Sequence, residues 1–141
     1  MILLLDTNVV SELLKDTPDA RVVAWAAQIP RSAMVTTSIT EAELRLGAAI
    51  LPPGRRRDLL EAAIDSIFRR WLAGSVLAFD SAATRRYAEF RALRRREGRS
   101  IAPNDAMIAA IGLAHGVAAI ATRNTIDFEG CGVALINPWQ G

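Results

Sequence analysis

The chain has 141 residues, 51% of them hydrophobic and 23% charged, which is enough for one domain with a substantial buried core. No apolar run approaches the ~20 residues that span a bilayer, and Asp6 interrupts the N-terminal run too early for a signal peptide. The net charge is only +2, but sixteen of the seventeen basic residues are arginines. We therefore expect a single domain over residues 1–141 that is not a membrane protein. The one cysteine, Cys131, excludes an intramolecular disulfide and favours the cytoplasm.

Strand-like and helical patterns alternate along the chain. Short apolar runs predict strands at residues 2–5, 33–36, 76–79, 119–121 and 133–136. Helices are expected from Thr17-Pro18, from the capping-box pattern of Ser38 and Glu41, from Gly54 to about residue 72, from Asp80 to about Gly98, and over residues 104–115. This alternation predicts a three-layer α/β fold with a mostly parallel central sheet flanked by helices.

The first strand ends on a carboxylate, in the sequence MILLLDTN. In open α/β sheets, ligands bind at the carboxyl ends of the strands, where Asp6 would stand. Alternatively, Asp6 only caps the helix that Val9 and Val10 begin.

Glu43 lies within an apolar helical stripe. Steps of 100° per residue predict that the buried face of this helix consists of Ile39, Ala42, Leu46, Ala49 and Ile50. A carboxylate on such a face needs a partner, because burying it ionised and alone costs several kcal/mol. Either an arginine or a metal ion would satisfy it.

Two further acidic positions follow later in the chain. Asp105 lies in the first turn of a helix that is apolar nearly all round, where the helix dipole favours an anion, so that capping alone would also explain it. The polar loop from Thr122 to Asp127 leaves the strand at 119–121, and its alternative interpretation is an ordinary turn.

Four carboxylates brought together would repel one another, and one or two Mg²⁺ or Mn²⁺ ions would neutralise them. Other chemistries lack their residues. The one histidine, His115, is ten residues from Asp105 on the same helix, ~15 Å along its axis, which is too far for a catalytic dyad. Cys131 has no CxxC partner for zinc, no glycine-rich phosphate loop follows a strand, and no lysine follows Lys15 to serve an aspartyl-phosphate site.

Arginine clusters mark several helices. On the helix from Ser81, the spacing of Tyr87, Phe90 and Leu93 predicts the buried face. The outward arginines of this region would contact RNA or a partner protein, or form a solvated face: Arg85, Arg95, Arg96 and Arg99.

These motifs, in this order, resemble the PIN-domain ribonucleases, and among them the VapC and FitB toxins of bacterial toxin–antitoxin pairs. The resemblance extends over essentially the whole chain. It rests on Asp6-Thr7-Asn8, on TEAELRLG at 40–47, on NDAMIAA at 104–110 and on the segment ATRNTIDFEGCGVALINPW at 121–139.

The resemblance implies a PIN-like fold with a five-stranded parallel sheet and a Mg²⁺-dependent endoribonuclease, with Mn²⁺ as a possible substitute. Asp6 and Asp105 would bind the metal, and Glu43 and Asp127 would complete the acidic site, unless Asn124 fills the fourth position. The supporting polar residues would be Thr7, Asn8, Thr122 and Asn124.

The resemblance also implies a set of partners. Besides the RNA substrate these are a cognate antitoxin, a second copy of the chain, and operator DNA bound through the antitoxin. The alternative is a non-catalytic module that binds RNA or protein through arginine-rich helix faces, although converging carboxylates would not help such a surface to bind RNA.

Overall fold

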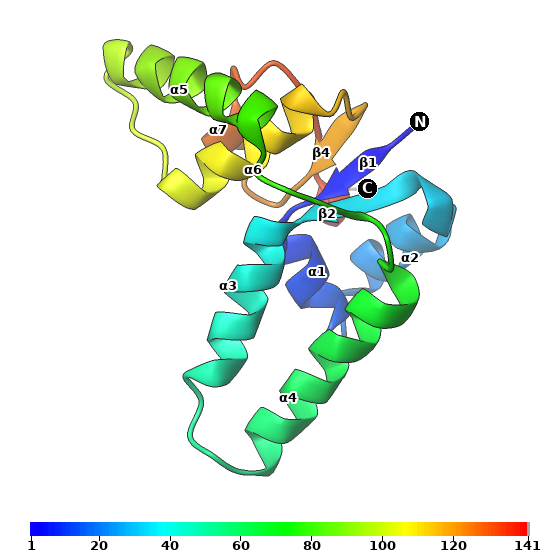
Figure 1. Cartoon of the computed structure of the whole chain (residues 1–141). Helices are drawn as coiled ribbons and strands as arrows, with labels where there is room; N and C mark the ends of the chain where they lie inside the picture. The colour runs from blue at the N-terminus through cyan, green and yellow to red at the C-terminus, as the bar shows by residue number, and fades with distance from the viewer. Residues whose placement is uncertain (141) are drawn as a thin grey trace.

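The computed structural model describes residues 1–140 as a three-layer α/β fold (Figure 1). Its five strands are β1 (Leu3–Leu5), β2 (Met34–Thr37), β3 (Val76–Leu77), β4 (Ala119–Ala121) and β5 (Ala134–Ile136). The α-helices are α1 (Thr7–Leu13), α2 (Ala20–Ala27), α3 (Ser38–Ala49), α4 (Arg55–Ser66), α5 (Ser81–Arg96), α6 (Pro103–Ala114) and α7 (Thr125–Phe128). Shorter turns are η1 (Arg31–Ala33), the π-helical η2 (Ile67–Trp71) and η3 (Pro138–Gln140). No helix within residues 1–140 is long and apolar enough to cross a membrane.

The strands form one parallel sheet in the order β3-β2-β1-β4-β5. The predicted α/β class, the parallel sheet and its five strands are confirmed, and β4 has the bounds expected from the sequence. Because β1 lies at the centre, between β2 and β4, the residues that follow these three strands meet at one edge of the sheet.

Each face of the sheet carries its own core. Leu4 and Ile120 point into a cluster with α5, α6 and α7, whereas Leu5 and Ala121 point into a cluster with α1, α2 and η2. Figure 1 shows these groups of helices on opposite sides of the sheet, with α3 and α4 forming a hairpin that projects away from it. The strands β1 and β4 are buried at every residue, which explains why their sequences are continuously apolar.

Two predicted helix starts are wrong. Helix α2 begins at Ala20 and is capped by Asp19, whose Oδ1 accepts from the Arg21 N–H at 2.9 Å, so Pro18 lies before the helix rather than at its first position. Helix α3 is capped by Thr37, whose hydroxyl accepts from the Thr40 N–H at 3.1 Å, in place of the expected cap at Ser38. In both cases another side chain nearby satisfies the open N–H groups of the first turn.

The predicted apolar stripe of α3 is also wrong. Leu46 and Ile50 are 62% and 73% exposed, whereas Thr40 and Ala48 are buried and Leu44 packs against the core beside α1. The register turned towards the core is therefore 40, 44 and 48, because the outer part of the α3–α4 hairpin lies beyond the sheet and has no layer to cover its other apolar side chains.

Helix α5 departs from the expected pattern at one turn. Ala83 and Phe90 are buried as core residues and Asp80 caps the helix, but Leu93 is 38% exposed. Arg94 is buried instead, with its guanidinium 5.5 Å from the centre of the Phe90 ring.

Candidate active site

Asp6 is buried at the carboxyl end of β1 and is held by three hydrogen bonds. Its Oδ1 accepts from the Thr7 N–H at 2.8 Å, and its Oδ2 accepts from the Thr122 hydroxyl at 2.8 Å and from the Asn8 Nδ2 at 3.2 Å. The first bond caps α1, so the capping interpretation is correct for one oxygen. The second oxygen joins Asp6 to the loop after β4.

Burial raises the pKa of Asp6 from 3.8 to about 6. The hydrogen bonds from Thr122 and Thr7 lower the pKa of this carboxyl, and the nearby charges of Asp105 and Glu43 raise it further. The charge of Asp6 is thus costly in the folded chain, even though its oxygens have hydrogen-bond donors.

Glu43 faces Asp6 from α3 at the end of a chain of threonine hydroxyls. Thr7 donates to Glu43 Oε1 at 2.8 Å, and the Thr7 and Thr40 hydroxyls lie 2.9 Å apart. Thr37 donates to Thr40 at 3.4 Å. Since Thr7 uses its proton for Glu43, Thr40 must donate to Thr7, and all the hydroxyls point their protons towards the carboxylate.

Asp105 reaches the same place from the first turn of α6. It is partly buried, and burial together with the charges of Glu43 and Asp127 raises the pKa of its carboxyl. It does not cap the helix, which begins after Ala102 without a side-chain cap, and within residues 1–140 its carboxylate accepts no hydrogen bond. The capping interpretation is therefore wrong for Asp105, whose charge is left without a protein donor.

The loop after β4 positions the fourth acidic residue. Asn124 N–H donates to the Thr122 hydroxyl at 3.1 Å, and the Asn124 carbonyl accepts from the Asp127 N–H at 3.0 Å, which starts α7. Asp127 is exposed, and its charge acts on Asp105. The Asn124 side chain is exposed and makes no cap.

The comparison with known proteins fits this geometry. Residues 3–129 match the PIN domain family. The chain belongs to this family. It is 42% identical to the VapC ribonuclease Y4jK of Sinorhizobium fredii over 98% of both chains, and 38% identical to the toxin FitB of Neisseria gonorrhoeae over 98% of this chain and 99% of FitB. The solved structure of FitAB bound to the IR36 DNA fragment aligns with a TM-score of 0.90 at 38% identity, over 98% of this chain and 96% of that one. The resemblance to PIN-domain toxins drawn from the sequence is confirmed.

The donor set of this PIN domain suits a hard cation held through few direct bonds. Its four carboxylates supply only oxygen, and none of them forms an ion pair with a basic side chain within residues 1–140. In the same residues no three His, Cys, Asp or Glu side chains are close enough together to hold a metal ion directly. Mg²⁺ commonly uses one or two carboxylates and keeps several waters, so the all-oxygen donor set is compatible with Mg²⁺ even without three converging protein ligands.

Sequence reasoning overlooked Thr37 and Thr40, which are both fully buried at the PIN-domain site. The run VTTSIT in the sequence could have indicated them, because it places hydroxyl residues at and just after the end of β2, as Asp6 follows β1. A polar residue at the carboxyl end of a parallel strand merits the same attention as a charged one.

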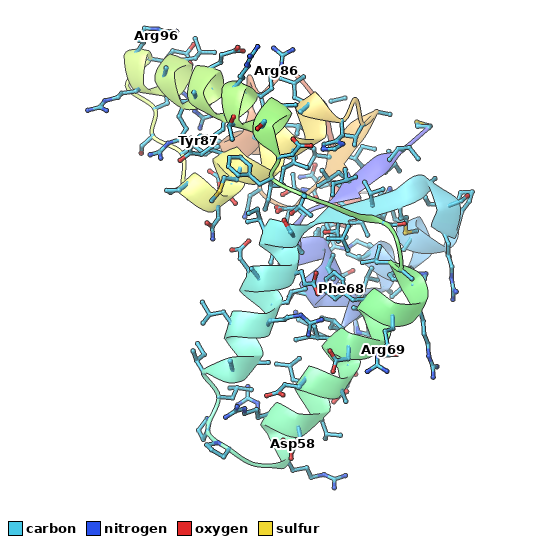
Figure 2. All side chains as sticks on the ribbon, in the orientation of Figure 1. Asp58, Phe68, Arg69, Arg86, Tyr87 and Arg96 are labelled. Carbon is cyan, nitrogen blue, oxygen red and sulfur yellow. The ribbon has the colours of Figure 1, made fainter. Side chains whose placement is uncertain are left out.

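The four arginines predicted as an RNA or partner surface are all exposed, but the structure does not bring them together. Arg95 and Arg99 line one hollow beside α5, and Arg85 lines another with Arg86. Arg96 lines neither of these and points away at the end of α5 (Figure 2).

Proposed function

We propose that this PIN-domain protein is a Mg²⁺-dependent endoribonuclease that acts in the cytoplasm as the toxin of a toxin–antitoxin pair. The observation that carries the proposal is the gathering of Asp6, Glu43, Asp105 and Asp127 at one edge of the sheet without any basic partner in residues 1–140. Folding pays an electrostatic cost for this arrangement, and a divalent cation would offset it. The likeness to Y4jK, a VapC ribonuclease, supports RNA as the substrate.

Asp6 and Asp105 would hold the metal. Asp6 Oδ1 accepts one hydrogen bond and keeps a lone pair, whereas Oδ2 accepts two, and the Asp105 oxygens are uncommitted. When bound, Mg²⁺ supplies positive charge that offsets the charge developing on the phosphate.

Glu43 and Asp127 would orient the attacking water. The Thr7 hydroxyl fixes Glu43 Oε1, leaving Oε2 to accept a proton from water that lies in line with the leaving oxygen of the phosphodiester. The buried hydroxyls of Thr40 and Thr37 hold Thr7 in this orientation.

The expected partners follow from the relatives. We propose that an antitoxin covers the acidic edge, that the toxin forms a homodimer, and that the assembly binds operator DNA through the antitoxin. The DNA-bound structure of FitAB, at 38% identity over nearly the whole chain, supports the DNA-bound assembly.

Cleavage of total RNA by variants of α3 tests the proposal. Glu43→Gln should reduce the rate about 100-fold or more, because a positioned acid–base group contributes roughly that much. The matched control is Glu41→Gln, which only breaks an exposed 2.8 Å ion pair with Arg45 and should cleave as the wild type does. Asp105→Asn should abolish cleavage with the fold intact.

Equal rates in the Glu43 and Glu41 variants would refute the assigned site. A wild-type chain that binds RNA but cleaves none with Mg²⁺ or Mn²⁺ would instead identify a non-catalytic binding module.

A further inference from the structure

A hollow of about 710 Å³ lies between the C-terminal half of α5 and the loop that leads into α6. Its size is within the usual range of small-ligand sites. Figure 2 shows Tyr87 on the side of α5 that faces α6. The walls include Tyr87, Arg91, Ala92, Arg95, Arg99 and Ile101.

The charge in this hollow is not neutralised within the described chain. Residues 1–140 offer Arg91 and Arg95 no carboxylate at ion-pair distance, whereas Arg45 and Arg57 elsewhere have partners at 2.8 Å. Arg99 shares its charge with Glu129 at 3.3 Å and with Glu97 at 3.9 Å. The hollow therefore presents an excess of positive charge to an anionic ligand.

One of the positive groups, Arg91, is held in place before any ligand arrives. Arg91 Nη1 donates to the Tyr87 hydroxyl at 2.8 Å, and its guanidinium lies 5.6 Å from the centre of that ring. The Tyr87 ring in turn packs edge-on against Phe79, at 5.6 Å between ring centres. A guanidinium fixed in this way loses less side-chain freedom when it binds a phosphate.

The buried Arg94, which does not line the hollow, holds in place the loop that forms one side of it. Its Nη1 donates to the Glu129 carbonyl at 2.8 Å and its Nε to the Arg99 carbonyl at 3.3 Å, while the Arg99 N–H returns a 2.8 Å bond to the Arg94 carbonyl. The loop carrying Arg99 is thus tied to α5 and to the segment after α7.

We propose that this hollow binds a nucleotide of single-stranded RNA, beside the nucleotides that lie at the acidic cluster. The guanidinium groups would contact phosphate, and the apolar wall of Ala92 and Ile101 would contact the ribose or base. Ile101 is four residues before Asp105, so their Cα atoms are at most about 15 Å apart, a span of a few nucleotides. The inference rests on the proposed function for its choice of RNA.

RNA binding at several salt concentrations tests the hollow separately from cleavage. We would measure the anisotropy of a labelled 12-nucleotide RNA without divalent cations, using Arg91→Gln/Arg95→Gln. The matched control is Arg55→Gln/Arg70→Gln, which changes the net charge equally at exposed positions on the α4 side of the molecule. The slope of log affinity against log salt should fall by about 1.4 in the first variant, and by less in the control, since each phosphate contact contributes roughly 0.7 on single strands.

Tyr87→Phe supplies a second measurement that keeps every charge. It removes the acceptor for Arg91 but keeps the ring packed on Phe79. RNA affinity should fall about threefold to tenfold at every salt concentration with an unchanged slope, as expected for one lost hydrogen bond.

If Arg91→Gln/Arg95→Gln shows the same salt slope and RNA affinity as Arg55→Gln/Arg70→Gln, the proposal is wrong, even if the first variant loses binding to a protein partner. If the double variant does not fold, an unchanged affinity in Tyr87→Phe overturns it alone. Failure of the wild-type chain to cleave RNA would contradict the proposed endoribonuclease activity. The binding measurements would still show whether RNA occupies the hollow.

Discussion

Asp6 caps α1 with one oxygen and joins the acidic cluster with the other. The two roles explain why a costly charge persists at this position. Its removal would cost the cap and the hydrogen bonds from Thr122 and Asn8, whereas Asp105 has no such bonds to lose. Asp6→Ala should therefore destabilise the fold, and Asp105→Asn is the better variant for separating catalysis from folding.

The raised pKa of Asp6 predicts how stability depends on pH in the absence of divalent cations. Between the unfolded pKa of 3.8 and the folded pKa of about 6, the folded chain keeps a proton that the unfolded chain loses. The free energy of unfolding should therefore fall as pH rises through this window, by on the order of 3 kcal/mol from this residue. Urea unfolding from about pH 4 to about pH 7 measures it.

Asp6→Asn serves as the comparison, because an asparagine at this position does not titrate. Any hydrogen bonds lost in the variant lower its free energy of unfolding by the same amount at every pH. The difference in stability between wild type and variant should shrink as pH rises. Parallel curves for the two proteins would contradict the assigned pKa.

At the scale of elements, α3 determines how Glu43 meets the site. The side chains at 40, 44 and 48 face the protein, and Glu43 lies at the border of that face next to Thr7. The outer part of the helix pairs with α4 through Arg45, whose guanidinium contacts Glu41 at 2.8 Å and Asp65 at 2.9 Å.

This register gives a direct stability prediction. Leu44→Ala removes packing against the core around α1 and should lower the free energy of unfolding by roughly 1–2 kcal/mol. Leu46→Ala, at a position 62% exposed, should change it by less than about 0.5 kcal/mol. Urea midpoints compare the two, and a larger loss at Leu46 would mean that the helix is turned the other way.

The sequence predicted the strands and the acidic residues better than the faces of the helices. A strand buried on both sides is a continuous apolar run, so β1 and β4 were easily found. Helix α3 carries apolar side chains all round, and the choice of face depends on how far the hairpin projects beyond the sheet, which no local pattern contains. The burial of Arg94 could not be predicted for a related reason: its partners are the backbone carbonyls of Arg99 and Glu129, which no side-chain pattern in the sequence reveals.

At the scale of the whole molecule, a ligand of the acidic edge would stabilise the entire fold. Mg²⁺ that binds the folded chain alone raises the free energy of unfolding by about 1.4 kcal/mol at ten times its Kd, or a few degrees in Tm. We expect this shift at neutral pH in the wild type, and its loss in Asp105→Asn.

Asp58→Asn is the matched control, since Asp58 lies at the far end of α4 (Figure 2) and should keep the full shift. Thermal melts with Mg²⁺ and with a chelator measure all three proteins. An equal shift in the two variants would place the Mg²⁺ elsewhere.

The central position of β1 has a consequence for synthesis of the protein. Asp6 is translated long before its hydrogen-bond partner Thr122, which follows 116 residues later, and Asp105 and Asp127 also come late in the sequence. A ribosome that stops before residue 127 releases a fragment without the complete acidic edge. The toxin proposed here would thus remain harmless to its own messenger RNA until the ribosome has passed residue 127.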